Sequence, residues 1–107
     1  MQLYGLKSCD SCRKATKALA DRGYTPVYVD VRKDGVPADV MAAAFDTFGD
    51  ALVNKSSTTW RGFTETQKAS DPLALLQDNP TLMKRPLIVR NGAMTLGWKD
   101  DAQGQYP

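Results

Sequence analysis

Apolar and polar residues change their spacing several times along this chain of 107 residues. Residues 2–6 and 25–31 are short apolar or β-branched stretches, which are typical of strands. Between them, residues from Cys9 to Arg22 place small and apolar side chains three and four positions apart, as an amphipathic helix does. Gly23 suits the left-handed residue that ends such a helix. This order predicts two parallel strands joined by a right-handed helical crossover.

The middle of the chain predicts helices. A segment from Pro37 to Phe48 carries an apolar stripe at helical spacing. Asp71–Pro72 is a helix-start signal, and Pro80 ends the helix that follows. Residues 52–62, between these helices, are polar, β-branched and rich in hydroxyls, so we predict a loop there. The apolar stripe of the first helix consists of Val40, Met41, Ala44, Phe45 and Phe48.

The last part of the chain predicts a hairpin and a short helix. Residues 85–89 form a third strand, entered through a proline that donates no hydrogen bond. Asn91–Gly92 is a strong hairpin signal that leads to a fourth strand near residues 94–97, and a short helix follows from Asp100. We expect one α/β domain over residues 1–107, with a β-α-β start, a helical insertion, a β-hairpin and a short C-terminal helix.

Composition and charge exclude several classes of function. The formal net charge is +2 and no run of five or more basic residues occurs, so we expect no nucleic-acid partner. Apolar runs fall far short of the roughly 20 residues that a membrane span needs. No export signal is visible at the N-terminus, so we expect a cytoplasmic protein. The size suits a single domain without a structural metal, and we expect a monomer.

Histidine is absent, which removes Ser-His-Asp and Cys-His activation and any His-ligated zinc site. Cys9 and Cys12 are the only cysteines, and they lie where the first strand gives way to the first helix. In a reducing compartment such a pair is more often catalytic or redox-sensing than structural. A reactive thiol in this chain must therefore be activated by backbone dipoles and by Lys or Arg.

The placement of the two cysteines predicts different roles for them. Cys9 lies where the first unpaired amides of the helix point, and their partial positive charge favours a thiolate. Cys12 lies one turn further, with Cα atoms about 5–5.5 Å apart, which is within the range for a disulfide. We expect an accessible Cys9 to attack and a shielded Cys12 to resolve the intermediate.

The helix terminus alone is too weak to activate Cys9. Lowering a thiol pKa from about 8.5 to 6.5 requires about 2.7 kcal/mol, whereas a helix terminus supplies at most about 2 kcal/mol. A charged hydrogen-bond donor contributes about 1.5–3 kcal/mol. The candidates are Arg13, Lys7 and Arg85, the last if the third strand lies beside the first. Asp10, an anion next to the sulfur, opposes the shift.

Other interpretations of these residues stay open. A Cys-x-x-Cys pair can be half of a zinc site, although only a dimer could complete it here, and buried cysteines can be inert. Asn54 and Lys55 either bind the carboxylates of a peptide or simply satisfy a turn. Trp60 either borders a substrate cleft or packs, and we expect Trp98 to cover the core or the hairpin.

Four separated motifs span essentially the whole chain in order. They are Tyr4-Gly-Leu-Lys-Ser-Cys9-Asp-Ser-Cys12-Arg-Lys-Ala15, Thr58-Thr-Trp-Arg61, Lys84-Arg-Pro-Leu-Ile88 and Leu96-Gly-Trp98. Together they resemble the arsenate reductase-like (ArsC/Spx) family, and within it most closely the small YffB-type proteins.

The resemblance implies a thioredoxin-like fold with a helical insertion. It implies that Cys9 is the redox nucleophile and that glutathione or glutaredoxin supplies the electrons, with no bound cofactor. In arsenate reductases of this type three arginines hold the oxyanion and the thiolate, and Arg85 matches the middle one. Pro86 matches the family's proline beside the active site, which is usually cis.

The chain also departs from the family pattern. Asn54 and Trp98 stand at the positions of the first and third arginines, which removes bidentate recognition of an oxyanion. Lys55 and Arg61 could compensate. Cys12 is a second departure, because the Spx branch has a Cys-x-x-Cys switch whereas YffB-type proteins usually keep only the first cysteine.

We therefore expect a cytoplasmic thiol-disulfide reductase linked to glutathione or glutaredoxin, acting on a small thiol, disulfide or oxyanion. The alternatives are an arsenate reductase proper, an Spx-like redox-sensing regulator that binds RNA polymerase, and a non-catalytic interaction module. The short stretch after the hairpin, without a long basic helix, argues against the regulator. The predicted catalytic residues are Cys9, Cys12 and Arg85. The predicted substrate-binding residues are Ser8, Asp10, Ser11, Arg13, Asn54, Lys55, Trp60, Arg61 and Pro86, with no metal ligands.

Overall fold

The computed structural model describes all residues from 1 to 107, and they form two compact units. Residues 1–34 and 85–107 form a β-sheet unit, and residues 35–84 form a helical unit. Each unit is described by itself. That the whole chain is one domain stays a prediction.

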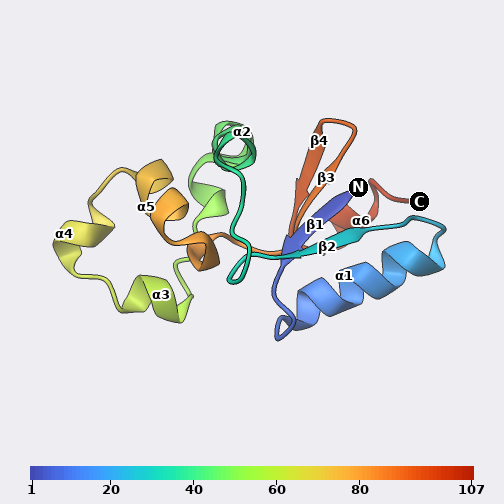
Figure 1. The fold of residues 1–107 in the computed structure, drawn as a ribbon, viewed down its shortest axis with the longest axis horizontal. Helices are drawn as coiled ribbons and strands as arrows, with labels where there is room; N and C mark the ends of the chain where they lie inside the picture. Colours follow the sequence, from blue (N-terminus) through green and yellow to red (C-terminus); the bar gives the residue numbers. More distant parts are fainter. The chain divides into compact units, whose positions relative to one another are not determined.

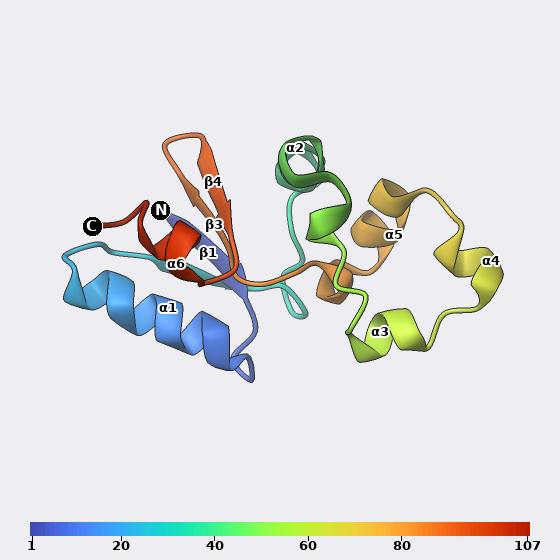
Figure 2. The ribbon, with the colours of Figure 1, turned by 180° about the vertical axis from the view of Figure 1, so that it is seen from behind.

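The β-sheet unit contains four strands in the order β2-β1-β3-β4 (Figures 1 and 2). They are β1 (Gln2–Gly5), β2 (Val27–Asp30), β3 (Leu87–Arg90) and β4 (Ala93–Leu96). β1 pairs with β2 in parallel and with β3 antiparallel, and β3 and β4 form the predicted hairpin. The third strand thus lies beside the first, which was the condition for Arg85 to act on Cys9. The α/β, thioredoxin-like fold class is confirmed.

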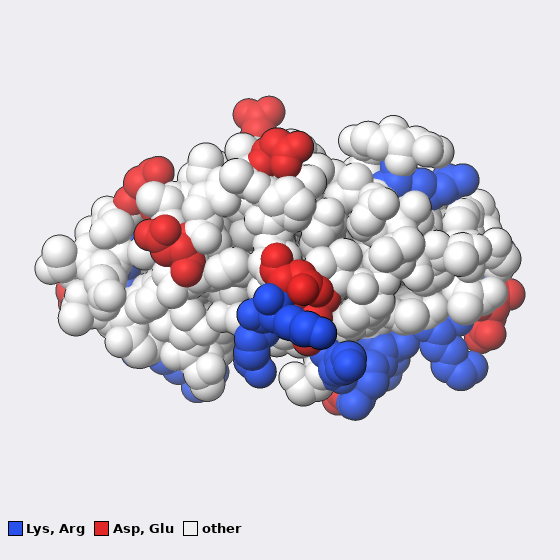
Figure 3. Space-filling model, in the orientation of Figure 1, with Lys and Arg blue, Asp and Glu red and all other residues white.

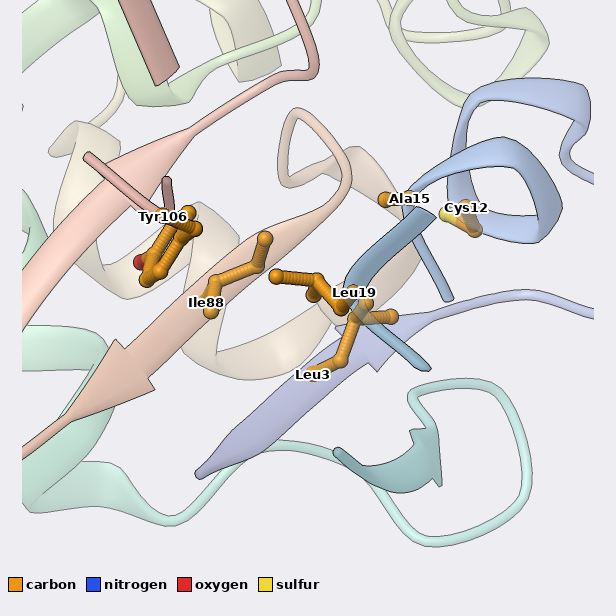
Figure 4. Close-up of a cluster of buried hydrophobic side chains, with 6 residues drawn as sticks. All are labelled: Leu3, Cys12, Ala15, Leu19, Ile88 and Tyr106. Atoms are coloured by element: carbon orange, nitrogen blue, oxygen red, sulfur yellow. The ribbon is translucent and has the colours of Figure 1, made fainter. Parts of the chain in front are cut away.

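One face of this sheet carries a cluster of buried hydrophobic side chains. The register places Tyr28, Leu3, Ile88 and Thr95 in a row across the four strands. Helix α1 (Asp10–Asp21) packs on this face, and the chain after α6 (Asp100–Gln103) returns to it, since Tyr106 belongs to the same cluster. Figure 4 shows the fully or almost fully buried members of this cluster, which are Leu3, Cys12, Ala15, Leu19, Ile88 and Tyr106.

Local sequence signals account for the end of α1 and for the turn between β3 and β4. At the end of α1, the Gly23 N–H donates to the Ala20 carbonyl and the Tyr24 N–H donates to the Leu19 carbonyl. With a φ of 93° at Gly23, this is a complete Schellman motif. The hairpin turn has positive φ at both Asn91 (51°) and Gly92 (80°), as a type I′ turn requires.

The helical unit contains four α-helices and two short 3₁₀ helices. They are α2 (Ala38–Phe48), η1 (Gly49–Leu52), α3 (Thr58–Arg61), α4 (Glu65–Lys68), α5 (Pro72–Asp78) and η2 (Pro80–Leu82). A β-bridge between Val53 and Met83 joins the residue after η1 to the residue after η2, and the Gln77 side chain ties α5 to the Ala38 carbonyl of α2 at 3.1 Å.

The prediction of a loop over residues 52–62 is wrong in its second half. Helix α3 forms there because the Ser57 hydroxyl caps it, accepting from the Trp60 N–H at 3.1 Å. Helix α4 was missed, although Thr64 and Gln67 form a capping box, a signal that is visible in the sequence. Asp71 caps α5 as predicted, through the Ala74 N–H. None of the helices has both the length and the apolar character that crossing a bilayer requires.

Candidate active site

Cys9 is the N-cap of α1, in the extended conformation expected of such a residue (φ −86°, ψ 116°). The segment between β1 and α1 turns sharply, because the Cys9 N–H donates to the Leu6 carbonyl at 3.0 Å. The Cys9 carbonyl accepts the first helical bond, from the Arg13 N–H at 3.1 Å. The end of a strand, a tight turn and a helix start thus place this thiol beyond the carboxyl end of the inner strand β1, where it is partly exposed.

Cys12, one turn further along α1, is fully buried in the core. It lies against β1, since a Cβ placed on Gly5 would be 2.6 Å from the Cys12 Sγ and 3.2 Å from the Tyr28 hydroxyl. Only glycine at position 5 leaves room for the sulfur. The predicted arrangement of an accessible Cys9 and a shielded Cys12 is therefore present.

The surroundings of Cys9 favour its thiolate. Burial alone would raise its pKa, but hydrogen bonding from the Cys12 thiol and backbone N–H, together with the positive charge of Arg85, holds the pKa of Cys9 below its ordinary value of 9.0. The sulfur makes no side-chain capping bond of regular geometry. The Cys12 amide belongs to the first turn of α1, so the direction agrees with the sequence argument about unpaired amides.

The pKa of the second thiol, Cys12, is shifted in the opposite direction. Burial and the neighbouring Cys9 sulfur raise the pKa of Cys12 to about 12. Cys12 therefore holds its proton more strongly than Cys9 does. The arrangement can supply a nucleophilic thiolate at Cys9 and a protonated, shielded thiol beside it.

Arg85 is the basic residue that acts on Cys9, out of the three candidates from the sequence. It lies two residues before β3, and the Arg85–Pro86 bond is cis, as the resemblance implied. Pro86 is buried, and its carbonyl accepts from the Gly97 N–H at 2.9 Å. Arg13 instead pairs with Asp10 one turn away on the exposed face of α1. Ser8 and Ser11, which flank Cys9, are exposed.

The remaining predicted residues belong to the helical unit. The Asn54 side chain accepts from the Ser56 N–H at 3.1 Å, which completes a local turn, and Arg61 donates to the Ser56 carbonyl at 2.5 Å. Lys55 and Trp60 line a pocket of about 260 Å³, where Lys55 Nζ lies 5.8 Å from the centre of the Trp60 ring.

Two residues near these sites were not singled out from the sequence. Lys68 lines the same pocket in the helical unit, with its Nζ 5.7 Å from the centre of the Trp60 ring. Tyr28 places its hydroxyl beside Cys12, and burial and the two thiols raise its pKa to about 12. Its position on the inner side of a β-strand was the only available signal. Trp98, as expected, packs on the core and stacks on Tyr106.

No group of three or more His, Cys, Asp or Glu side chains is arranged to hold a metal ion.

Comparison with known proteins connects this geometry to a family. Residues 4–105 match the model of the ArsC family. An uncharacterized protein from Haemophilus influenzae is 42% identical, over 92% of this chain and 90% of its own length. The global transcriptional regulator Spx from Staphylococcus aureus is 24% identical, over 92% of this chain and 80% of its own.

Solved structures show the same fold. A protein named YffB superimposes with a TM-score of 0.87 at 28% identity, covering 98% of this chain and 96% of that one. An arsenate reductase-related protein from Brucella melitensis superimposes with a TM-score of 0.72 at 29% identity, covering 98% and 92%.

Proposed function

Because this chain belongs to the ArsC family, we propose that it is a thiol-disulfide reductase linked to glutathione or glutaredoxin, with Cys9 as its redox nucleophile. The family match and the arsenate reductase-related neighbour support a thiol-dependent oxidoreductase. The observation that carries the proposal is the geometry of the pair, in which Cys9 is the partly exposed N-cap of α1 and Cys12 is buried one turn behind it. The lowered pKa of Cys9 and the raised pKa of Cys12 agree with it. We place the protein in the cytoplasm, where thiols are kept reduced, and expect a monomer.

The proposed reaction proceeds in two exchange steps. The Cys9 thiolate attacks one sulfur of a substrate disulfide, forms a mixed disulfide and releases the first substrate thiolate. Cys12 then attacks the Cys9 sulfur, its proton passes to the second leaving thiolate, and a Cys9–Cys12 disulfide remains. The substrate has gained two electrons and the protein has lost two. Two glutathione molecules, or a glutaredoxin, return the protein to the dithiol.

Arg85 has two tasks in this scheme. Its charge stabilises the Cys9 thiolate before attack, and the same charge stabilises that thiolate when Cys9 is itself the leaving group during reduction. Cys12 contributes by remaining protonated, so that its S–H donates to Cys9 and it does not compete as a nucleophile before the mixed disulfide forms.

Turnover of hydroxyethyl disulfide with glutathione tests this proposal in the wild type, Cys9→Ser and Cys12→Ser. We expect Cys9→Ser to abolish turnover. If Cys12→Ser also loses turnover, the reaction uses both thiols. If Cys12→Ser retains turnover, glutathione resolves the intermediate. Activity that survives in Cys9→Ser contradicts the proposal.

Two alternatives are distinguished by parallel measurements. Arsenate in the same assay tests an arsenate reductase proper, which the Asn54 and Trp98 substitutions disfavour. An Spx-like regulator is suggested by the Cys-x-x-Cys spacing and by the Spx relative. Capture of RNA polymerase that depends on the redox state, without turnover of either substrate, favours that regulator.

A further inference from the structure

A pocket of about 440 Å³ in the β-sheet unit adjoins the segment that carries both cysteines. Its walls include Lys7, two residues before Cys9, and Arg13, one turn after it. The lining also includes Asp30, the last residue of β2, and Lys33 from the turn that follows. The pocket is therefore at the carboxyl ends of the parallel strands β1 and β2, where open α/β sheets bind their ligands.

Tyr28 connects this pocket to the thiol pair. This residue lines the pocket, while its hydroxyl and the Cys12 Sγ both border the space that Gly5 leaves free, at 3.2 and 2.6 Å from a Cβ placed there. Tyr28 therefore belongs both to the lining of the pocket and to the surroundings of Cys12. The volume falls within the range of small-molecule sites, which is about 300–1,000 Å³.

Cations outnumber carboxylates by one in the lining of the pocket. Three cations line it, Lys7, Arg13 and Lys33, against the two carboxylates of Asp30 and Asp34. Asp30 is already engaged, because its Oδ1 accepts from the backbone N–H groups of Arg32 at 2.9 Å and Lys33 at 3.1 Å.

The two lysines have charge available for a ligand. Neither Lys7 nor Lys33 forms an ion pair, whereas Arg13 pairs with Asp10. Figure 3 shows basic side chains gathered over α1, with acidic ones beside them near its start.

From these observations we infer that the pocket binds the carboxylate-bearing part of the disulfide substrate, with Lys7 and Lys33 as residues that select for anionic disulfides. The inference rests on the proposed function and names its substrate class: disulfides whose substituents carry carboxylates within a few atoms of the sulfur. Thiol chemistry itself does not need these lysines; they contribute to the choice of substrate.

A matched pair of disulfides tests the inference in a single turnover of the reduced, full-length protein. The probes are dithiodiglycolate, which carries two carboxylates, and hydroxyethyl disulfide, which is uncharged and of similar size. The measured quantity is the ratio of their rate constants for thiol release, divided by the same ratio for free dithiothreitol. The division by the dithiothreitol ratio removes the difference in intrinsic reactivity between the two disulfides. Because both disulfides react with the same Cys9 thiolate, the ratio also cancels any effect of a lysine on the thiolate fraction.

We expect a normalised ratio above one for the wild type. Lys7→Ala and Lys33→Ala should each lower it by about two- to fivefold, the range of partly exposed ion pairs. Lys33→Arg, which keeps the charge, should retain the wild-type ratio. Added salt should lower the ratio in the wild type but not in a variant that combines Lys7→Ala and Lys33→Ala. Lys17→Ala is the control, because this exposed lysine pairs with Asp21 on α1 and does not line the pocket.

An unchanged ratio in both alanine variants overturns the inference and leaves the proposed function intact, provided that the uncharged disulfide still reacts. If Cys9 reacts with neither disulfide, the proposed function itself fails.

Discussion

The start of α1 and the starts of three helices in the helical unit are similar local structures with different uses. In the helical unit, a side-chain oxygen of Ser57, Thr64 or Asp71 accepts a hydrogen bond from a backbone N–H of the helix that it caps. At α1 the N-cap is Cys9, whose sulfur makes no regular capping bond. The oxygen caps are satisfied within their own helix, whereas the amides at α1 remain available to stabilise a sulfur anion.

The same contrast extends to the basic residues. In the helical unit, Arg61 donates to the Ser56 carbonyl, and Lys55 and Lys68 lie over the Trp60 ring. In the β-sheet unit, Arg85 acts on Cys9. Polar groups that satisfy each other locally stabilise a fold, while a cation directed at a titratable thiol changes its chemistry.

The largest effect is expected when the Arg85 guanidinium is removed, because this changes the reactivity of Cys9. Because Arg85 lowers the pKa of Cys9, Arg85→Ala should move the midpoint of the alkylation pH profile upward, toward 9.0. At pH 7 we expect the alkylation rate to fall by about three- to tenfold, since the loss of thiolate outweighs its increased nucleophilicity. Iodoacetamide kinetics from pH 5 to 10 measure both quantities.

Arg90→Ala is the matched control for that experiment. This arginine is the last residue of β3, and its Cζ lies 5.1 Å from the centre of the Tyr24 ring. An equal fall in rate for both variants, or an unmoved profile in Arg85→Ala, contradicts the role of Arg85.

The glycines of the two units should respond differently to an added methyl group. A Cβ at Gly5 would lie 2.6 Å from the Cys12 Sγ, so we expect Gly5→Ala to lower the free energy of unfolding by about 1–3 kcal/mol. At Gly62, at the end of α3, the nearest atom would be 3.4 Å away and φ is −78°, so Gly62→Ala should be nearly neutral. Urea unfolding measures both variants, and equal losses would contradict the close approach of β1 to Cys12.

Removing the side-chain oxygen that caps a helix should destabilise the protein less than Gly5→Ala does. Ser57→Ala removes the acceptor for the Trp60 N–H and should lower the free energy of unfolding by about 1 kcal/mol. Thermal or urea unfolding of the full chain provides the measurement, and Ser57→Thr, which keeps the hydroxyl, should lose less. A neutral Ser57→Ala variant would show that water replaces the cap.

The smallest effect is expected where the sulfur cap becomes an oxygen cap. Cys9→Ser installs a better acceptor at the start of α1, so the free energy of unfolding should stay the same or rise by a few tenths of a kcal/mol. Reactivity with iodoacetamide at this position should disappear in the same variant. A clear loss of stability would mean that Cys9 contributes more to packing than to chemistry.

Much of the fold could be predicted because its signals are local. The strands and helices around Gly23, Asp71 and Asn91–Gly92 end or begin where caps and turns require it. The prediction of a loop over residues 52–62 failed because the one-turn helix α3 has too little periodic sequence to detect. Its formation depends on the Ser57 cap. The capping box of α4 was detectable from the spacing of Thr64 and Gln67.

The sequence by itself determined that a thiol would stand at a helix start with a second thiol one turn behind it, because both placements follow from the spacing of residues along one helix. Only the tertiary structure decided which cation would meet that thiol and what would surround its partner. Arg85 lies two residues before β3 and Tyr28 belongs to β2, and these two strands flank β1. The pairing and register of distant strands bring these side chains to the sulfurs, and no local pattern contains that information.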